Sequence, residues 1–384
     1  MQTSAYRSPW MTEELDEVRQ LARTFLAEKS VPYHEKWAAQ RSVDRQFWNA
    51  AGKAGLLCIG VPEEYGGGGG TFAHEAVVIE EQARVADDAW AYSVHSTIVA
   101  QYVLNHGTEE QKRRWLPGMA SGELVGAIAM TEPDTGSDLQ NVRTAARRDG
   151  GDYLINGSKT FISNGTHCDL LIIVARTGSE PGGHGLSLIV AETRDLPGFQ
   201  RGRVLEKIGM KGQDTRELAF LDMRVPVANL LGGSEGQGFG QLMSQMPQER
   251  LAIAVSAVGM MEAATAEAVR YAKNRTAFGH DLMQFQNTRF VLAECKTETL
   301  AARTLLDHCI SLRLDGRLDA ATASMAKYWC TQKQCEVVDK CVQVFGGYGY
   351  MLEYPIARMY AAARVQKIYG GTNEIMKELI ARSL

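Results

Sequence analysis

The chain has 384 residues, 45% of them hydrophobic, so it can bury a large core in two or three domains. Its net charge of -4 gives no reason to expect nucleic acid or an anionic membrane as a partner, and no run of about 18 apolar residues predicts a membrane span. The polar N-terminus resembles neither a signal peptide nor a presequence. We expect an intracellular protein with reduced cysteines and no metal site, from a bacterial cytoplasm or, as a mature chain, a mitochondrial matrix.

Residues 1–125 have a helical pattern. Apolar residues spaced three and four apart over 15–26 predict a first helix, with Thr12 as its N-cap. A second short helix is expected to end at Pro117-Gly118. Between them, the five glycines 66–70 are interpreted as a flexible turn and not as a phosphate loop, because no Gly-Lys-Ser/Thr follows them.

Residues 126–235 change to short β-rich runs separated by Gly, Pro, Asn and Asp. We expect two of these strands to meet at a turn through Asn156-Gly157. The region is long enough for a compact β domain of its own.

Residues 236–384 return to helical patterning. A long helix is expected to open with Pro247 in its first turn and to end near Asn274. Another is expected to stop at Gly346-Gly347. Long antiparallel helices with short connections predict a bundle, so the whole chain is expected to have an α+β fold.

The C-terminal stretch "KIYGGTNEIM" predicts a strand-like end, a turn and a helix. Gly370 and Gly371 carry no side chain where the chain changes direction, and Thr372 or Asn373 can cap a helix beginning at Glu374. Such a turn can offer its backbone to a phosphate or a carbonyl. Taken alone, it also fits simple helix capping.

Four further stretches, "AMTEPDTGSD", "FISNG", "RTAFG" and "QVFGGYGY", each also fit an ordinary turn, hairpin or helix end. In this order, and followed by "IYGGTNEIM", they resemble the acyl-CoA dehydrogenase family over essentially the whole chain. "PQERL" and the closing "IYGGTNEIMKELIAR" resemble its long-chain branch. The resemblance implies a helical domain (1–125), a β-barrel-like domain (126–235) and a C-terminal four-helix bundle (236–384).

The resemblance also implies FAD. The matching positions around its isoalloxazine ring are Met130, Thr131, Phe161, Ile162 and Ser163, with Thr372 and Glu374 as further cofactor contacts. Those for the pyrophosphate and adenosine half are Arg275, Phe278, Gln286, Gln343, Gly346 and Gly347. Many relatives carry Trp where this chain has Phe161. Because family members take part of the second set from a neighbouring subunit, an oligomer is implied, usually a tetramer.

The catalytic base is expected at Glu249. Many relatives carry a glutamate at the position of Gly370, where this chain has no side chain. The long-chain and isovaleryl branches carry it on a helix, at the position of Glu249, from which it would take the substrate α-proton. The Gly370 N–H would donate to the thioester carbonyl. Without the family frame, Glu249 also reads as an exposed acid in a first helical turn, where the helix dipole would lower its pKa and burial would raise it.

Substrate contacts implied by the resemblance include Ser137 on the CoA arm and Arg250 near the thioester. The remaining candidates line the acyl chain or the turn: Val94, His95, Val99, Val103, Tyr369 and Gly371. His95 also reads as a possible base, although a wall residue is the better interpretation.

The expected function is dehydrogenation of a medium or long straight-chain acyl-CoA, with electron-transfer flavoprotein as electron acceptor. Two alternatives stay open. One is an isovaleryl-type or other branched-chain enzyme, and the other is a catalytically silent flavin or acyl-CoA binding protein.

Overall fold

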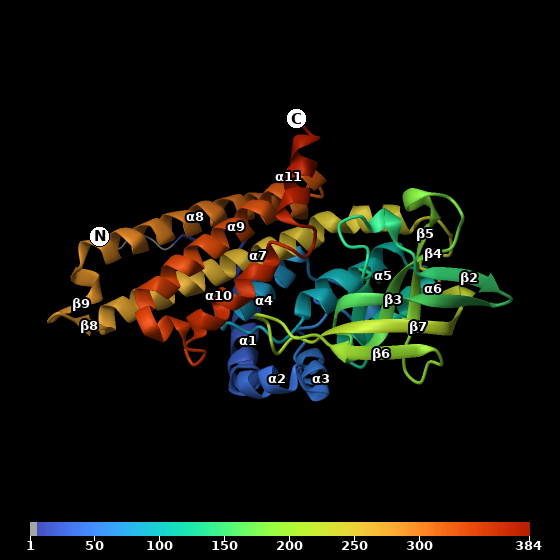
Figure 1. Cartoon of the computed structure of the whole chain (residues 1–384), viewed down its shortest axis with the longest axis horizontal. Helices are drawn as coiled ribbons and strands as arrows, with labels where there is room; N and C mark the ends of the chain where they lie inside the picture. Colours follow the sequence, from blue (N-terminus) through green and yellow to red (C-terminus); the bar gives the residue numbers. More distant parts are fainter. Residues whose placement is uncertain (1–5) are drawn as a thin grey trace.

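A helical region, a curled β-sheet and a bundle of long helices follow one another along the chain (Figure 1). This computed structural model describes residues 6–384. The α+β fold predicted from the sequence, with the three parts in this order, is confirmed.

Short helices make up the N-terminal region, together with a π-helical segment, η3, that continues directly into α5. The elements are α1 (Glu13–Lys29), α2 (His34–Gln40), α3 (Arg45–Lys53), α4 (Phe72–Arg84), η3 (Ser93–Val99), α5 (Ala100–His106) and α6 (Glu109–Ser121). Thr12 caps α1 as predicted, because its hydroxyl accepts a hydrogen bond from the Leu15 N–H at 3.2 Å.

The glycine run 66–70 is a packed turn. A Cβ atom on Gly67 would lie 2.1 Å from the Val61 carbonyl oxygen, so no side chain fits there. The run therefore serves close packing before α4, and the flexible turn expected from the sequence is better described as a tightly packed one.

The prediction that α6 ends at Pro117 is wrong. The helix continues to Ser121, and Gly122, with φ of 78°, terminates it. Leu116 and Met119 are fully buried on either side of the proline. Burial of these side chains outweighs the cost of about 3 kcal/mol that a proline brings to a helix interior.

The central region is a seven-stranded sheet within the described residues, ordered β1-β4-β2-β3-β7-β6, with β5 paired to β4. Its strands are β1 (Val125–Ala129), β2 (Ala145–Asp149), β3 (Asp152–Ser163), β4 (Cys168–Arg176), β5 (Leu186–Glu192), β6 (Phe199–Val204) and β7 (Thr215–Pro226). The β1–β4 pairing is parallel and most others are antiparallel.

The expected turn at Asn156-Gly157 is also wrong. β3 runs straight through these residues, with an irregularity in its pairing to β7 between Ile155 and Gly157. The hairpin turn lies earlier, at Gly150-Gly151 between β2 and β3. An Asn-Gly pair is a strong turn signal, but here a bulge absorbs the glycine.

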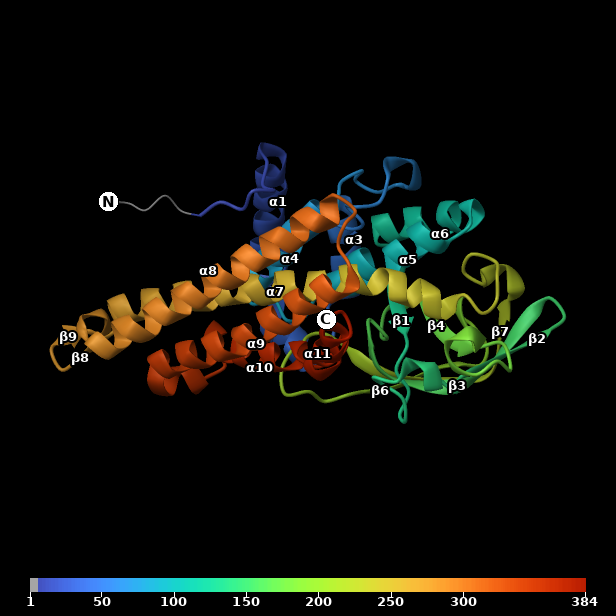
Figure 2. The ribbon, with the colours of Figure 1, turned by 90° about the horizontal axis from the view of Figure 1, so that it is seen from above.

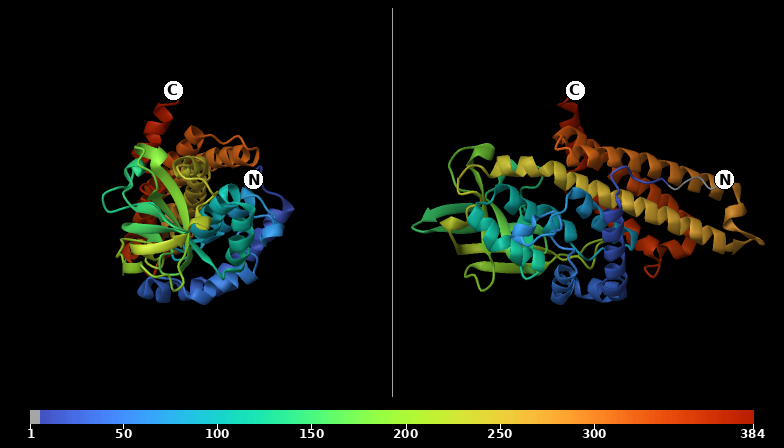
Figure 3. Two further views of the ribbon diagram at one scale, coloured as in Figure 1. Left: turned by 90° about the vertical axis from the view of Figure 1, so that its right-hand side faces the viewer. Right: turned by 180° about the vertical axis from the view of Figure 1, so that it is seen from behind.

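Helix α7 (Gly238–Asn274) runs the length of the molecule, from the sheet to the small β8–β9 hairpin (Figure 2). Its partners are α8 (Gln286–Leu314), α9 (Ala320–Phe345) and α10 (Pro355–Gln366), and α11 (Asn373–Ala381) follows; the hairpin strands are β8 (Thr276–Ala277) and β9 (His280–Asp281). Viewed from the end, α7 lies near the middle of the molecule, with the sheet on one side and the N-terminal helices on the other (Figure 3). By length and composition α7 could cross a membrane, although 61% of its most apolar window is buried within the protein.

Pro247 does not open α7, as the sequence suggested. The helix begins at Gly238 and contains the proline in its interior. Leu242 and Leu251, before and after it, are fully buried. Tertiary packing again extends a helix through a proline, so the residues just after Pro247 lie in the interior of α7 and not in its first turn.

Candidate active site

Glu249 lies about three turns inside α7, so the expectation of a first-turn position is wrong and the helix dipole does not act on it. The side chain is buried, with 5% of its residue surface exposed. Burial raises the pKa of Glu249 to about 7, while a hydrogen bond from the Tyr102 hydroxyl to Oε1 (2.8 Å) and the charge of Arg250 oppose that rise. A carboxyl group with this pKa can both hold and release a proton near neutral pH.

The Gly370-Gly371 turn faces Glu249 from the end of α10. Residues 367–369, before the two glycines, form a turn after α10 ends at Gln366 and are not strand-like, which corrects the sequence-based expectation. Gly370 and Gly371 have φ of 65° and 92°, a conformation that favours glycine. A Cβ atom on Gly370 would lie 2.4 Å from Cδ1 of Ile253, one turn after Glu249. Ile253 thus fills the space that a side chain at position 370 would need.

Two buried cations hold the carbonyl groups of this turn. The Lys327 ammonium donates to the Gly371 carbonyl at 2.7 Å and to Oδ1 of Asn373 at 3.0 Å. Arg250 reaches the Gly370 carbonyl with Nε at 3.5 Å. Burial, and then the charge of Arg250, lower the pKa of Lys327 to about 7. The turn is therefore fixed from its carbonyl side.

A cavity of about 170 Å³ joins Glu249 to Gly370. Val94 and Ile98 of η3, Ile253 of α7 and Tyr369 form its walls near these two residues. The structure thus brings the predicted base, the glycine turn and two of the predicted substrate contacts, Val94 and Tyr369, into one site.

Three of the predicted wall residues do not line this cavity. Val99 and Val103 are fully buried in the apolar core that η3 and α5 share with the sheet. His95 is buried beside β1, where its Nδ1 accepts a hydrogen bond from the Gly126 N–H at 2.9 Å. Burial lowers the pKa of His95 to about 4, so the imidazole is neutral at pH 7 and has a structural role. Val94 and Ile98 lie on the face of η3 towards the cavity, whereas His95 and Val99 lie on the face towards the core, a difference that apolar spacing alone does not indicate.

The remaining predicted substrate contacts lie outside the cavity wall. Arg250 is directed to the Gly370 carbonyl and to Oγ of Ser324 at 3.4 Å, so it contacts the turn itself. Gly371 lies on the side of the turn near Arg250. Ser137 is exposed in the loop that follows β1.

The segments predicted to contact the flavin ring lie side by side, where β1 and β3 end. The Thr160 N–H donates to the Thr131 carbonyl at 2.9 Å, which joins the Met130-Thr131 turn to the end of β3. Ile162 is buried under the sheet, whereas Phe161, with φ of 60°, is 66% exposed. Ser163 ends β3 beside them. An exposed aromatic side chain held in a left-handed conformation fits a flat ring that would cover it.

Thr372 and Glu374 stand at the start of α11. The Thr372 hydroxyl accepts from the Ile375 N–H at 3.3 Å and caps the helix, as predicted, with Asn373 as the first helical residue. Glu374 is exposed in the first turn.

The residues predicted for the adenosine half lie at the other end of the bundle, near the β8–β9 hairpin (Figures 1 and 2). Arg275, Gln343, Gly346 and Gly347 line one groove there, of about 560 Å³. Phe278 at the hairpin tip is 93% exposed, and Gln286 is exposed at the start of α8. A single chain therefore does not bring these residues to Phe161, which fits a cofactor shared between subunits.

Sequence reasoning missed Tyr102, Ile253 and Lys327. The contact between Tyr102 and Glu249 spans 147 residues, and no local pattern reveals it. Lys327 carried one available signal, because a lone lysine in the apolar stretch "ATASMAKYWC" is expected to be buried only with partners.

Family models of the acyl-CoA dehydrogenase N-terminal, middle and C-terminal domains match residues 12–123, 127–223 and 236–384. Together with the fold, these matches define the class of the protein, a three-part acyl-CoA dehydrogenase.

Individual relatives agree. A rat protein named long-chain specific acyl-CoA dehydrogenase, mitochondrial, is 48% identical over 97% of this chain and 87% of its own length. An acyl-CoA dehydrogenase of Bacillus subtilis is 39% identical over 97% of this chain and 98% of its own. The crystal structure of acyl-CoA dehydrogenase from Geobacillus kaustophilus matches with a TM-score of 0.95 at 44% identity, covering 98% of this chain and 99% of that one. The chain belongs to the acyl-CoA dehydrogenase family, whose members are FAD-dependent oxidoreductases.

Proposed function

We propose that the chain oxidises an acyl-CoA thioester to the trans-2-enoyl-CoA, with Glu249 as the base that removes the α-proton. The observation that carries the proposal is the cavity in which Glu249 faces the Gly370 turn. FAD, when bound, supplies the acceptor for the hydride that leaves the β-carbon. Glu249 is the carboxylate that lines this cavity beside the turn, and its pKa near 7 suits proton transfer at neutral pH.

The Gly370 N–H is the proposed donor to the thioester carbonyl. Arg250 and Lys327 hold the Gly370 and Gly371 carbonyl groups, which fixes the two peptide planes that follow this N–H and leaves the N–H itself without a bond to either side chain. Such a donor strengthens its bond as negative charge develops on the thioester oxygen, and losing one costs about 3 kcal/mol of barrier. Stabilising this charge lowers the pKa of the α-proton and brings it closer to the pKa of a carboxylate base.

For the acyl group, we propose a medium or long straight chain. The 48% identity to proteins named long-chain specific supports this choice. A short or branched chain is the second candidate, because the cavity of about 170 Å³ is smaller than the roughly 300 Å³ at which ligand pockets usually begin. A relative named isovaleryl-CoA dehydrogenase is 32% identical.

We also propose electron-transfer flavoprotein as acceptor, a homotetramer as the assembly and the cytoplasm of a bacterium as the location. A solved structure titled as an electron transferring flavoprotein of Acidaminococcus fermentans matches at 36% identity. The groove lined by Arg275 and Gly347, and the exposed Phe278 at the tip of the nearby β8–β9 hairpin, support subunit contacts there. The bacterial relative supports the location.

Anaerobic mixing of the holoenzyme with an acyl-CoA tests the function. We expect butyryl-, octanoyl- or palmitoyl-CoA, or isovaleryl-CoA, to bleach the visible flavin band of the wild type but not of Glu249→Gln, and the fastest thioester identifies the acyl class. Bleaching at equal rates in both would move the base elsewhere. Failure of every thioester in the wild type would favour the silent binding protein.

A further inference from the structure

The cavity that begins at Glu249 has a polar inner end. α10 runs antiparallel to α7 along it: Gly370 lies beside Ile253, and Nε2 of Gln366 donates to Oγ of Ser256 at 3.2 Å, one turn further along α7. Met260, also on the cavity wall, lies about 16 Å along α7 from Glu249, at 1.5 Å a residue. An acyl chain entering at Glu249 would therefore point along α7 towards this inner end.

Charged and amide side chains surround the inner end. Gln82, Asp87 and Asp88 come from α4 and the loop after it, and Arg358 comes from α10. Trp90 closes the same wall. A cavity meant only for a hydrocarbon chain would be lined by apolar groups here, since polar groups beside an apolar ligand lose their hydrogen bonds to water.

Unpaired polar atoms concentrate at this place. Among residues 6–384, eight buried side-chain nitrogen or oxygen atoms have no hydrogen-bond partner. Four of the eight belong to residues that line this one cavity: Oδ2 of Asp87, Nε1 of Trp90, Nε of Arg358 and Oε1 of Gln366. Two are donors and two are acceptors. Folded proteins leave few such groups unpaired, so a cluster of four at the end of a substrate cavity needs an explanation.

We propose that the inner end binds a neutral oxygen group, a hydroxyl or a carbonyl, carried by the acyl chain of the substrate. The inference rests on the proposed function and gives it a substrate class, an acyl-CoA with an oxygenated chain. A hydroxyl both donates and accepts, so it can pair with Trp90 or Arg358 on one side and with Gln366 or Asp87 on the other.

The charges at the inner end favour a neutral group over a carboxylate. Among the residues that line the cavity, Asp87 and Asp88 are two acids beside the single guanidinium of Arg358; Lys207, which also interacts with Asp88, does not line it. His34 contributes no compensating charge, because burial, and then the charge of Arg358, lower its pKa. A carboxylate at the end of the acyl chain would lie beside two carboxyl groups in a site of low dielectric constant.

The test compares plain and ω-hydroxy acyl-CoA thioesters at each length from hexanoyl to dodecanoyl, using the holoenzyme and flavin reduction as the readout. At the best length we expect kcat/KM to be about tenfold higher for the hydroxylated thioester, the effect of one net hydrogen bond. Trp90→Phe keeps the aromatic ring and loses the N–H, and Gln366→Met loses the amide oxygen. Both variants should lower this ratio towards one, because each removes a partner of the hydroxyl, whatever the rate with the plain thioester becomes.

Trp48→Phe is the matched control, because Nε1 of Trp48 is also buried and unpaired but Trp48 lies outside the cavity. Its substrate ratio should equal that of the wild type. Preference of the wild type for plain chains at every length would overturn the inference, and so would preference for ω-carboxyl chains. A preference that survives in both cavity variants would place the oxygen group elsewhere. If no thioester reduces the flavin, the proposed function itself fails.

Discussion

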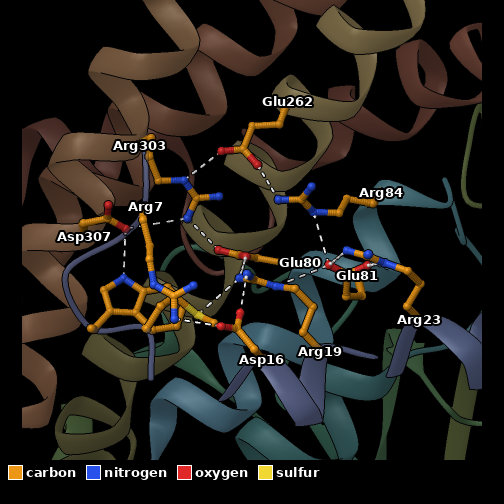
Figure 4. Close-up of polar contacts among 12 residues, drawn as sticks. Arg7, Asp16, Arg19, Arg23, Glu80, Glu81, Arg84, Glu262, Arg303 and Asp307 are labelled. Carbon is orange, nitrogen blue, oxygen red and sulfur yellow. Dashed lines mark hydrogen bonds and ion pairs between the residues drawn. The ribbon is translucent and has the colours of Figure 1, made fainter. Parts of the chain in front are cut away.

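Two groups of buried glutamates in this molecule have opposite environments. Glu80 and Glu81 of α4 are each 1% exposed and lie in a network of arginines (Figure 4). Glu249 of α7 is 5% exposed and lies at the cavity. The glutamates are about equally buried in the two places, so the comparison shows how the neighbours of a buried carboxylate determine its role.

In the network, each carboxylate contacts more than one guanidinium. Arg303 of α8 lies 2.5 Å from Oε1 of Glu80, and Arg19 of α1 lies 3.2 Å from Oε2. Glu81 pairs with Arg23 at 2.9 Å. Burial alone would lower the pKa of Arg303, but the carboxylates of Glu80 and Glu262 outweigh it and raise that pKa. These charges join α1, α4, α7 and α8.

Glu249 has only the Tyr102 hydroxyl and the charge of Arg250 to support its ionised form, and burial outweighs them. The carboxylates of the network have several guanidinium partners and join helices, whereas Glu249 has few such partners, a pKa near 7 and the ability to exchange a proton. Buried acids therefore differ in role according to their partners, and each of the following changes tests that reading.

The largest effect is expected from Glu249→Gln. The amide cannot accept the α-proton, so flavin reduction by the best acyl-CoA should slow by about 10⁴-fold. Glu80→Gln, the counterpart in the network, should lower stability but keep the rate per folded molecule. Stopped-flow reduction at saturating substrate measures both. Equal losses in the two variants would contradict the separation of roles.

Moving the catalytic carboxylate from position 249 to position 370 should not restore activity while Ile253 is present. Glu249→Gly combined with Gly370→Glu places a Cβ atom 2.4 Å from Ile253 in a left-handed conformation. We expect the double variant to be as slow as Glu249→Gly alone, and adding Ile253→Ala to recover at least about tenfold in the rate. Recovery in the double variant without Ile253→Ala would show that the isoleucine is no obstacle.

Breaking the arginine–glutamate network should cause the next largest effect, a loss in the free energy of unfolding. Arg303→Met removes the partner that Glu80, Glu262 and Asp307 share, and leaves uncompensated buried charge at a cost of about 3 to 5 kcal/mol. Arg317→Met is the control, because Arg317 is exposed and 3.9 Å from Asp315, and it should change stability by less than about 1 kcal/mol. Urea unfolding followed by circular dichroism would decide. Identical midpoints for the two variants would show that the network does not stabilise the fold.

Glu249 should destabilise the protein at high pH. Its pKa is about 7 in the folded chain and 4.5 as a free side chain, so the folded state binds more protons between these values and stability falls as the pH rises through them. Above pH 7 the buried carboxylate costs on the order of 3 kcal/mol, which Glu249→Gln should recover. The gain should vanish below pH 4.5. Urea midpoints of both proteins at pH 5 and pH 8 measure it, and a gain that does not grow with pH would contradict the raised pKa.

Much of the site was predictable from the sequence because local motifs carry it. The stretch "PQERL" and the vacancy at Gly370 together indicated Glu249, and the threonine after the two glycines indicated the cap of α11. The order of the motifs indicated the three-part fold. Each of these signals lies within a few consecutive residues.

The electrostatic environment was not predictable, because it arises from packing between distant segments. Pro247 suggested a helix start, yet burial of Leu242 extends α7 in front of it and removes the dipole from Glu249. Tyr102 meets Glu249 from α5, and Ile253 replaces the side chain missing at Gly370. The burial of Glu249 and its hydrogen-bond and charge partners set its pKa, and they could be found only from the structure.

The smallest effect concerns Tyr102, whose hydroxyl favours the ionised form of Glu249. Without it, in Tyr102→Phe, the pKa of Glu249 should rise by about one unit, so kcat/KM at pH 7 should fall about fivefold and recover above pH 9. Tyr92→Phe removes a similar buried tyrosine–glutamate hydrogen bond at Glu75, away from the cavity, and should lower stability without moving the pH profile. A profile unchanged in Tyr102→Phe would mean that the hydroxyl only fills space, and that burial and the charge of Arg250 set the proton affinity of Glu249.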